Sequence, residues 1–440
     1  MTNVFHRNPK NKPPIAKDGQ GIYLTDASGN KYIDASGGAA VSCLGHGDPE
    51  VIKAIKEQAQ TLAYAHTGFF SSEPAEILAD LLIEQAPLDF GKVLFLSGGS
   101  EAIEAALKLA RQYHIEKGEP QRCKFIARRQ SYHGNTLGAL ALGGNQWRRK
   151  HFEPILFNVS HISPCFAYRE KNKDETEREY GLRVADELEL EILELGSDNV
   201  AAFVAETVVG ATAGAVPPVP GYFQRVREIC DKYGVLLILD EVMCGLGRTG
   251  TFFAFEQDGV SPDIVAIAKG LSGGYQPIGA LLCTNKIYDT IYEGSGSFQH
   301  GHTFMGHPIA CAASLAVMNA IIERGLLENV RVVGNYFEKK LKEAFNAHPI
   351  IGDIRGRGLF RGLEVVKNRI TKEPFDPALK INIQIKNKAL ANGLICYPMG
   401  GTIDGERGDH ILLAPPFIVT HSDIDAIVAI LETVINSLES

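Results

Sequence analysis

Two short aliphatic runs that each end in an ionisable residue constrain the fold more than any other feature. Val235 to Leu239 precedes Asp240, and Ile264 to Ala268 precedes Lys269. Both runs are too short for a helix and contain β-branched residues, so they predict strands buried on both faces, as in a parallel sheet. Ligands of open α/β sheets bind at the carboxyl ends of the strands. Asp240 and Lys269 are therefore predicted to face one ligand.

The two charged side chains have two interpretations, because a buried charge requires a partner. In the first interpretation, Asp240 and Lys269 pair with each other. In the second, both contact a cofactor that carries an aldehyde and a basic ring nitrogen. Pyridoxal phosphate carries both groups and a phosphate, and it requires from the protein a lysine, an acid and an anion-binding turn. The rest of the chain must then supply that turn.

A turn of small residues meets this requirement. Lys92 to Leu96 is predicted as a buried strand; the turn Ser97-Gly98-Gly99-Ser100 follows it and leads into a helix with Ala102 and Ala106 on its apolar face. The free amides and the dipole of a first helical turn both favour phosphate. The alternative is an ordinary helix cap. Neither glycine-rich nucleotide-binding motif is present, so a nucleotide ligand is not indicated.

Two further predicted strands bring candidate residues to the same edge. Lys124 to Ala127 leads to Tyr132 and His133, and Val200 to Val204 leads to Glu206. An aromatic side chain just past a strand end can stack on a planar ring, although a tyrosine packed on the sheet edge is the alternative. Tyr132, His133 and Glu206 are predicted to contact the cofactor.

Composition narrows the class of protein. With 440 residues, of which 45% are apolar, the chain can bury a large core in two or more domains. Its net charge of −8 argues against nucleic acid or an acidic membrane as a partner, and the short basic run Arg148-Arg149-Lys150 is predicted to be a solvated loop.

Other features of the sequence predict location and exclude a metal. Eight scattered cysteines without a C-x-x-C pair, and the absence of a signal peptide or a stretch of membrane-spanning length, predict a cytoplasmic protein with reduced thiols. The spacing of His300, His302 and His307 fits no common zinc site, so no metal is predicted.

The pattern of elements predicts how the chain is divided. Residues 1–60 are predicted to be an N-terminal segment of a small domain, with a β-hairpin around Ser28 to Asn30. Residues 61–325 form the large α/β domain, and residues 326–440 form the small α+β domain, in which short strands follow the amphipathic helix Val330 to Phe345.

With these motifs in this order, the sequence resembles the class III, or omega, aminotransferases, which are pyridoxal phosphate enzymes of fold type I. The resemblance covers nearly the whole chain. It implies an α/β fold with a mostly parallel central sheet, helices on both faces and a smaller α+β C-terminal domain. It also implies a homodimer, with a tetramer as the alternative.

The resemblance gives each motif a role. Lys269 matches the Schiff-base lysine, and Asp240 matches the acid that holds the ring nitrogen. Val242 is implied to lie against one face of the ring and Tyr132 against the other. The remaining implied contacts are to the phosphate: they come from Gly99 and Ser100, and from Thr303 of the neighbouring subunit.

Departures from the family pattern concern the substrate. Met243 replaces the glutamine of amino-acid-type members, and Leu412 stands where members that bind an α-carboxylate have arginine. Arg407 is the candidate for binding a substrate carboxylate, and a solvated loop arginine is the alternative. The predicted function is ping-pong transfer of an amino group from an amine or an ω- or β-amino acid to a keto acid such as pyruvate.

Two other functions compete with amino transfer. One is a racemase or aminomutase that uses the same cofactor, because the first chemical steps are shared. The other is a binding protein that has kept the fold without the cofactor, against which the complete set of lysine, acid and phosphate turn argues.

Overall fold

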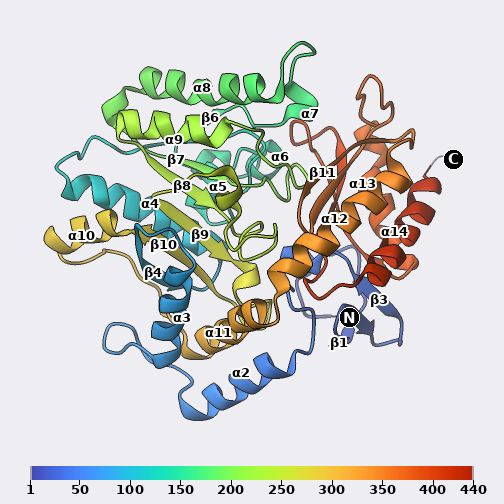
Figure 1. Cartoon of the computed structure of the whole chain (residues 1–440), viewed down its shortest axis with the longest axis horizontal. Helices are drawn as coiled ribbons and strands as arrows, with labels where there is room; N and C mark the ends of the chain where they lie inside the picture. The colour runs from blue at the N-terminus through green and yellow to red at the C-terminus, as the bar shows by residue number, and fades with distance from the viewer. Residues whose placement is uncertain (1, 439–440) are drawn as a thin grey trace.

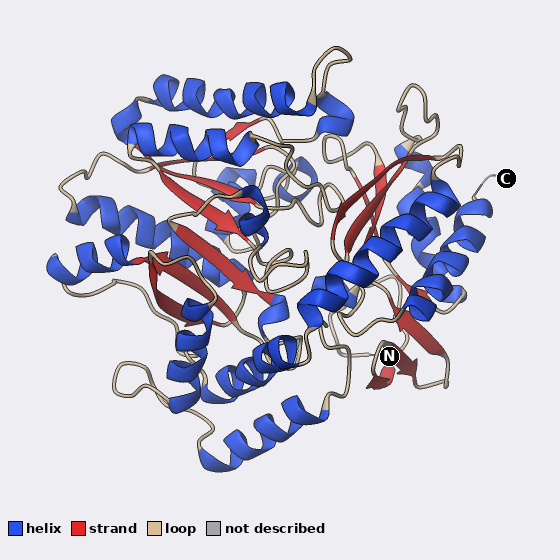
Figure 2. Ribbon diagram, in the orientation of Figure 1, coloured by secondary structure: helices blue, strands red, loops and turns tan. Residues whose placement is uncertain are grey.

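The computed structural model describes residues 2–438, and its centre is a seven-stranded sheet with the order β4-β10-β9-β8-β7-β5-β6 (Figures 1 and 2). β10 runs antiparallel to its neighbours β4 and β9, whereas the other neighbours pair in parallel. The strands are β4 (Phe90–Leu96), β5 (Lys124–Arg128), β6 (Ser160–Ile162), β7 (Val200–Glu206), β8 (Leu236–Asp240), β9 (Ile264–Ala268) and β10 (Gly279–Thr284).

Helices cover both faces of this sheet, and alternate strand residues point to each. Leu237 and Leu239 of β8 pack in the cluster that contains α8 (Glu177–Leu195) and α9 (Tyr222–Tyr233). Leu236 and Ile238 instead pack in the cluster that contains α4 (Gly99–Glu116). Figure 1 shows α8 and α9 stacked on one side of the sheet. This arrangement explains why the central strands are uninterrupted aliphatic runs, and it confirms the predicted α/β architecture.

Two smaller sheets lie to the other side of the molecule in Figure 1. One has the order β1-β2-β3-β13, and the other has the order β11-β12-β15-β14. Their strands are β1 (Ala16–Gln20), β2 (Tyr23–Asp26), β3 (Lys31–Asp34), β11 (Ile351–Arg357), β12 (Phe360–Val365), β13 (Leu394–Ile395), β14 (Tyr397–Gly400) and β15 (Asp409–Leu413). Because β3 pairs in parallel with β13, the N-terminal segment and the C-terminal region share a sheet. The domain limits at residues 60 and 325 stay a prediction.

The remaining helices are α1 (Gly37–Ala40), α2 (Pro49–Thr61), α3 (Glu73–Glu84), α5 (Leu137–Leu142), α6 (Gln146–Arg149), α7 (Ala167–Glu170), α10 (Asn285–Glu293), α11 (Pro308–Glu323), α12 (Leu326–Phe345), α13 (Ile381–Ala391) and α14 (His421–Asn436). Within the described residues, no single helix is long and apolar enough to cross a membrane. α11 and α12 meet that test only when taken together, and they are bent by 66° to one another.

One local prediction is confirmed and one is wrong. The hairpin is present, because β2 and β3 pair antiparallel on either side of the Ser28 to Asn30 turn. The solvated loop at residues 148–150 is wrong: Arg148 and Arg149 belong to α6, and Arg149 is buried. The Arg149 guanidinium donates hydrogen bonds to the carbonyls at the end of α5, which the helix itself leaves without partners.

Candidate active site

The carboxyl ends of the parallel strands meet at one edge of the central sheet. Glu206 ends β7 beside Asp240 at the end of β8, and Lys269 directly follows β9. These three side chains border a cavity of about 480 Å³. Its lining also includes Ser97, Gly98, Gly99, Ser100, Tyr132, His133, Val242 and Met243. The tertiary structure thus brings together the predicted lysine, acid, aromatic residue and small-residue turn.

Asp240 is held from two sides. Its Oδ2 atom lies 2.8 Å from His133 Nδ1, and its Oδ1 atom accepts a hydrogen bond of 3.0 Å from the Val242 amide. Within residues 2–438, no hydrogen bond or ion pair joins Asp240 to Lys269. The interpretation that these two charges pair with each other is therefore wrong, because His133 takes that place.

Lys269 has an unusual backbone and an altered acidity. Its φ angle is +48°, in the left-handed region that residues with a side chain rarely adopt. Burial lowers the pKa of Lys269 to about 8, although Asp240 and Glu206 act to raise it. Strained backbone and a perturbed lysine are features that gather at functional sites. A larger share of this amine is neutral near pH 7 than of an ordinary lysine, so it is a better nucleophile.

Glu206 connects two segments of the site. Its buried carboxylate accepts hydrogen bonds from the amides of Tyr132, at 3.2 Å, and Gly210, at 3.1 Å. Burial raises the pKa of Glu206, and the nearby Asp240 adds to this effect while His133 opposes it. Besides lining the cavity, Glu206 thus holds the backbone that carries Tyr132.

The small-residue turn leaves space for an anion. A Cβ atom added to Gly98 would meet no atom within 4 Å, whereas one added to Gly99 would lie 2.9 Å from Val242 Cγ1. Val242 therefore requires glycine at position 99, and the space beside Gly98 opens at the first turn of α4. That turn presents amides that cannot bond within the helix.

A second feature of the cavity also fits a polar ligand. The buried Nε2 atom of His133 has no hydrogen-bond partner among residues 2–438. The acid, the amine and the anion-binding turn in one cavity match what pyridoxal phosphate requires of a protein, and His133 Nε2 is a further polar atom able to bind a ligand there.

Sequence analysis missed several residues of the cavity wall, among them Ser272, Gln276 and Ile278. These three lie on the connection from β9 to β10. Because β10 is antiparallel to β9, it begins at the edge where β9 ends, and the whole connection stays beside Lys269. The nearby Gly273-Gly274 pair was the only signal in the sequence. It predicted a turn, but it did not indicate that this turn lies beside the cavity.

Two predicted site residues lie elsewhere in this chain. Thr303 is exposed and lines a separate cavity of about 930 Å³, and its carbonyl accepts a hydrogen bond from Tyr64 Oη. Arg407 is largely exposed, and its Nε atom lies 2.6 Å from Asp404 Oδ2. Neither side chain lines the cavity around Lys269. Their roles stay predictions.

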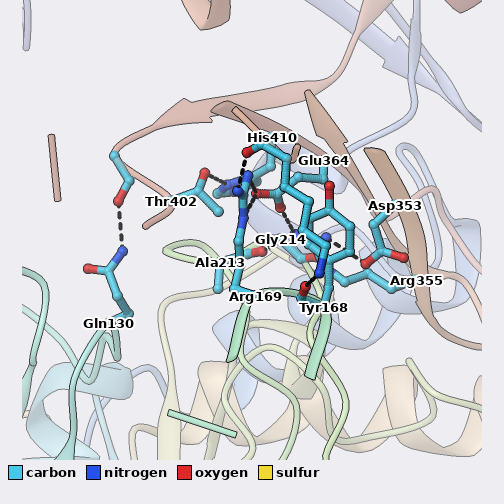
Figure 3. Close-up of polar contacts among 12 residues, drawn as sticks. Gln130, Tyr168, Arg169, Ala213, Gly214, Asp353, Arg355, Glu364, Thr402 and His410 are labelled. Carbon is cyan, nitrogen blue, oxygen red and sulfur yellow. Dashed lines mark hydrogen bonds and ion pairs between the residues drawn. The ribbon is translucent and has the colours of Figure 1, made fainter. Parts of the chain in front are cut away.

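The site is also anchored to the C-terminal region of the chain (Figure 3). Gln130, two residues before Tyr132, donates a hydrogen bond of 2.7 Å to the carbonyl of Gly401. The Gln130 carbonyl accepts a hydrogen bond of 2.5 Å from Thr212 Oγ1. The segment that carries Tyr132 is thereby held between the loop after β7 and the loop after β14.

A buried ion network forms a second anchor (Figure 3). Glu364 of β12 lies 2.6 Å from Arg169 of α7 and 2.6 Å from Arg355 of β11. Arg355 also donates a hydrogen bond of 2.8 Å to the carbonyl of Gly214, in the loop that follows Glu206. No sequence signal could have found these contacts, because the partners are distant along the chain.

Comparison with known proteins identifies the family. The model of the family described as aminotransferase class III matches residues 4–435 of the chain. The chain is a class III aminotransferase. It is 49% identical over 435 residues to an uncharacterized aminotransferase of Schizosaccharomyces pombe, covering 99% of this chain and 95% of that protein.

One further relative and one solved structure show the same similarity. A diaminobutyrate–2-oxoglutarate transaminase of Halomonas elongata is 37% identical, covering 96% of this aminotransferase and 90% of the relative. The crystal structure of an omega transaminase from Pseudomonas jessenii in complex with PMP matches with a TM-score of 0.92 and 32% identity. The match covers 98% of this chain and 96% of that one.

Family membership confirms the predicted chemistry. Class III aminotransferases depend on pyridoxal phosphate, so this aminotransferase uses that cofactor and has the corresponding fold type I architecture. The comparisons give no support to the racemase or aminomutase alternative. They also contradict the alternative of a binding protein without activity, because the family and the similar proteins are aminotransferases.

Proposed function

We propose that Lys269 and Asp240 are the catalytic residues of an aminotransferase that takes amines or ω- or β-amino acids as donors and a keto acid such as pyruvate as acceptor. One observation carries the assignment of the reacting lysine. Lys269 lines both the cavity at the strand ends and an adjoining cavity of about 1570 Å³. Its amine therefore stands between a place for the cofactor and a place for the substrate.

The proposed roles of the two catalytic residues follow from their surroundings. Bound pyridoxal phosphate supplies an electron-withdrawing ring and a carrier for the amino group. Lys269 Nζ would hold the cofactor covalently. Once the donor amine displaces it, the freed Nζ would accept a proton from the amine-bearing carbon of the donor and deliver it to the cofactor carbon that had held the lysine. Asp240, fixed by His133 and the Val242 amide, keeps a carboxylate where the ring nitrogen must hold its proton.

The other proposed cofactor contacts come from the walls of the same cavity. Gly99 and Ser100 would hold the phosphate at the first turn of α4, and Tyr132 and Val242 would contact the two faces of the ring. Glu206 and His133 would act mainly on neighbours, since Glu206 holds the Tyr132 amide and His133 holds Asp240.

Two observations support the proposed donors. Met243, which lines the cavity, is apolar where amino-acid-type members have glutamine. Relatives include a protein named as a diaminobutyrate–2-oxoglutarate transaminase, and solved neighbours are named omega transaminases. 2-Oxoglutarate therefore belongs beside pyruvate in any test of acceptors. The cytoplasmic location stays a prediction.

The position of Thr303 leads us to propose a homodimer. Thr303 does not line the cavity around Lys269 in its own chain. Thr303 can reach a phosphate in that cavity only from a second copy of the chain. Large apolar side chains are exposed on the two segments that the hydrogen bond from Tyr64 to Thr303 joins, which is typical of a surface that another chain covers. These side chains are Leu62, Tyr64, Phe69 and Phe70 on the first segment and Phe304 on the second.

Lys269→Ala tests the proposed role of the lysine. We expect the variant to fold as the unmodified protein does, since only a half-buried side chain is shortened. It should lose steady-state transamination of a donor panel with pyruvate and 2-oxoglutarate, and it should lack the absorbance of lysine-bound cofactor. Lys286→Ala, which changes an exposed lysine of α10, is the matched control. Substantial turnover by the Lys269 variant would overturn the assignment.

A further inference from the structure

Arg148 lies beside the reacting lysine with an unused positive charge. We propose that its guanidinium binds the carboxylate of the amino acid and keto acid substrates, so that the preferred substrates are anionic. This inference rests on the proposed function and names the substrate class of the same site. The sequence had placed Arg148 in a solvated basic run.

The position of Arg148 is set by α6 and by two aromatic rings. Its guanidinium carbon lies 4.4 Å from the centroid of the Tyr132 ring and 5.7 Å from that of Trp147. All three residues line the cavity of about 1570 Å³ that adjoins Lys269. Arg148 is also near enough to contribute to lowering the pKa of Lys269. The charge is therefore fixed at the wall of the substrate cavity, close to the amine that reacts.

The neighbouring cations have acidic partners, whereas the Arg148 guanidinium has no acidic partner in the described part of the chain. Lys150 lies 3.6 Å from Glu406, and Arg149 lies 3.6 Å from Glu153 and donates to backbone carbonyls. No hydrogen bond or ion pair of the Arg148 guanidinium is made with any of residues 2–438. Arg7, in the exposed N-terminal segment, lines the same cavity and adds a second positive charge to its wall. The cavity thus has an excess of cation beside the reacting amine.

Stacking leaves this guanidinium ready for a planar anion. When arginine lies over an aromatic ring, its N–H groups remain free at the edge of its plane. Those groups form a fork that matches a carboxylate with two parallel hydrogen bonds. The rings of Tyr132 and Trp147 also restrict the side chain, so less entropy is lost on binding. Donor and acceptor occupy the same cavity in turn, so one arginine can serve a carboxylate in both half-reactions.

Arg407 is the competing residue for this role. It lines neither the cavity around Lys269 nor the adjoining one, and its guanidinium already holds Asp404 at 2.6 Å. Binding a substrate there requires the pair to break and the loop to move. Arg148 needs neither change.

The test compares substrates that differ only in the carboxylate. The cofactor-loaded protein is mixed with a single donor, and the half-reaction is followed by cofactor absorbance. Alanine and β-alanine are compared with ethylamine, and 4-aminobutanoate with propylamine; in the reverse half-reaction, pyruvate is compared with acetaldehyde. In Arg148→Gln, the apparent second-order rate constant should fall roughly 10- to 100-fold for the carboxylates, the factor for one lost charge-assisted hydrogen bond. It should change less than about threefold for the neutral partners.

Controls separate charge binding from packing. Arg148→Lys should recover part of the loss, and Lys232→Gln, which removes an exposed, paired cation that lines neither cavity, should leave the ratio of carboxylate to neutral rates unchanged. An equal loss for carboxylates and neutral substrates would mean that Arg148 only supports the Tyr132 ring, and would overturn the proposal. A selective loss in Arg407→Gln instead of Arg148→Gln would overturn it as well.

A binding measurement keeps this inference separate from the aminotransferase assignment. Propanoate has a carboxylate but no amino or keto group, so its binding by calorimetry does not depend on turnover. Weaker binding by Arg148→Gln than by the unmodified protein supports the anion site even if every donor fails to react. Equal binding overturns the anion site, while transamination by the unmodified protein would leave the proposed function standing.

Discussion

Covalent attachment of pyridoxal phosphate to the apoprotein should accelerate as the pH rises through about 8. Only the neutral amine of Lys269 attacks the aldehyde, and burial lowers the pKa of Lys269 from 10.5 to about 8. At pH 7, an amine with that lowered pKa is neutral in roughly one molecule in ten, against about three in ten thousand for an ordinary lysine. The surroundings of Lys269 thus raise the reactive fraction about 300-fold.

The assay mixes apoprotein with pyridoxal phosphate between pH 6 and 10 and follows the absorbance of the bound form. Borohydride reduction followed by peptide mass analysis then locates the modified lysine. The same titration with a free lysine derivative corrects for ionisation of the cofactor itself. We expect the corrected rate constant to increase about tenfold per pH unit below 8 and to level off above it.

The carboxylate of Asp240 predicts how a substitution should shift the pH midpoint of cofactor attachment. Asp240 raises the pKa of Lys269 against the effect of burial. Asp240→Asn should therefore move the midpoint to lower pH, because the ammonium form loses a favourable neighbour. A midpoint near 10.5 in the unmodified protein would refute the reasoning from burial. A shift to higher pH in the variant would refute the assigned sign of the Asp240 effect.

The same Asp240→Asn variant probes the proposed catalytic acid, and one further substitution probes the anchor of the site. Asp240→Asn should keep the hydrogen bond from the Val242 amide but lower kcat in steady-state assays by roughly 100-fold or more, because the carboxylate no longer stabilises the positive ring nitrogen. Glu364→Gln should lower the free energy of unfolding, measured by urea denaturation, by about 3–5 kcal/mol, because it leaves the cation of Arg169 without a carboxylate partner and leaves the buried Arg355 with Asp353 alone. The control Glu373→Gln removes an exposed pair with Lys367 and should cost less than about 1 kcal/mol; equal costs would contradict the burial argument.

Much of the candidate site could be predicted from the sequence, because its residues lie at the ends of strands and at the start of a helix. A buried parallel strand must be aliphatic along its whole length, so a charged residue at its end marks the edge where ligands bind. Asp240 and Lys269 were found in this way, and Gly99 and Ser100 were found from a turn that opens a helix. The sequence therefore determined the fold class, and it predicted the cavity edge at which Asp240 and Lys269 meet.

The tertiary structure decided which groups touch. Asp240 and Lys269 share an edge, but only the packed sheet shows that His133 takes the carboxylate and leaves the amine free. Arg148 looked like part of a solvated run until α6 placed it against the Tyr132 ring. Local sequence encodes periodicity and turn chemistry, whereas these contacts join segments distant along the chain, and their geometry depends on how the finished layers pack.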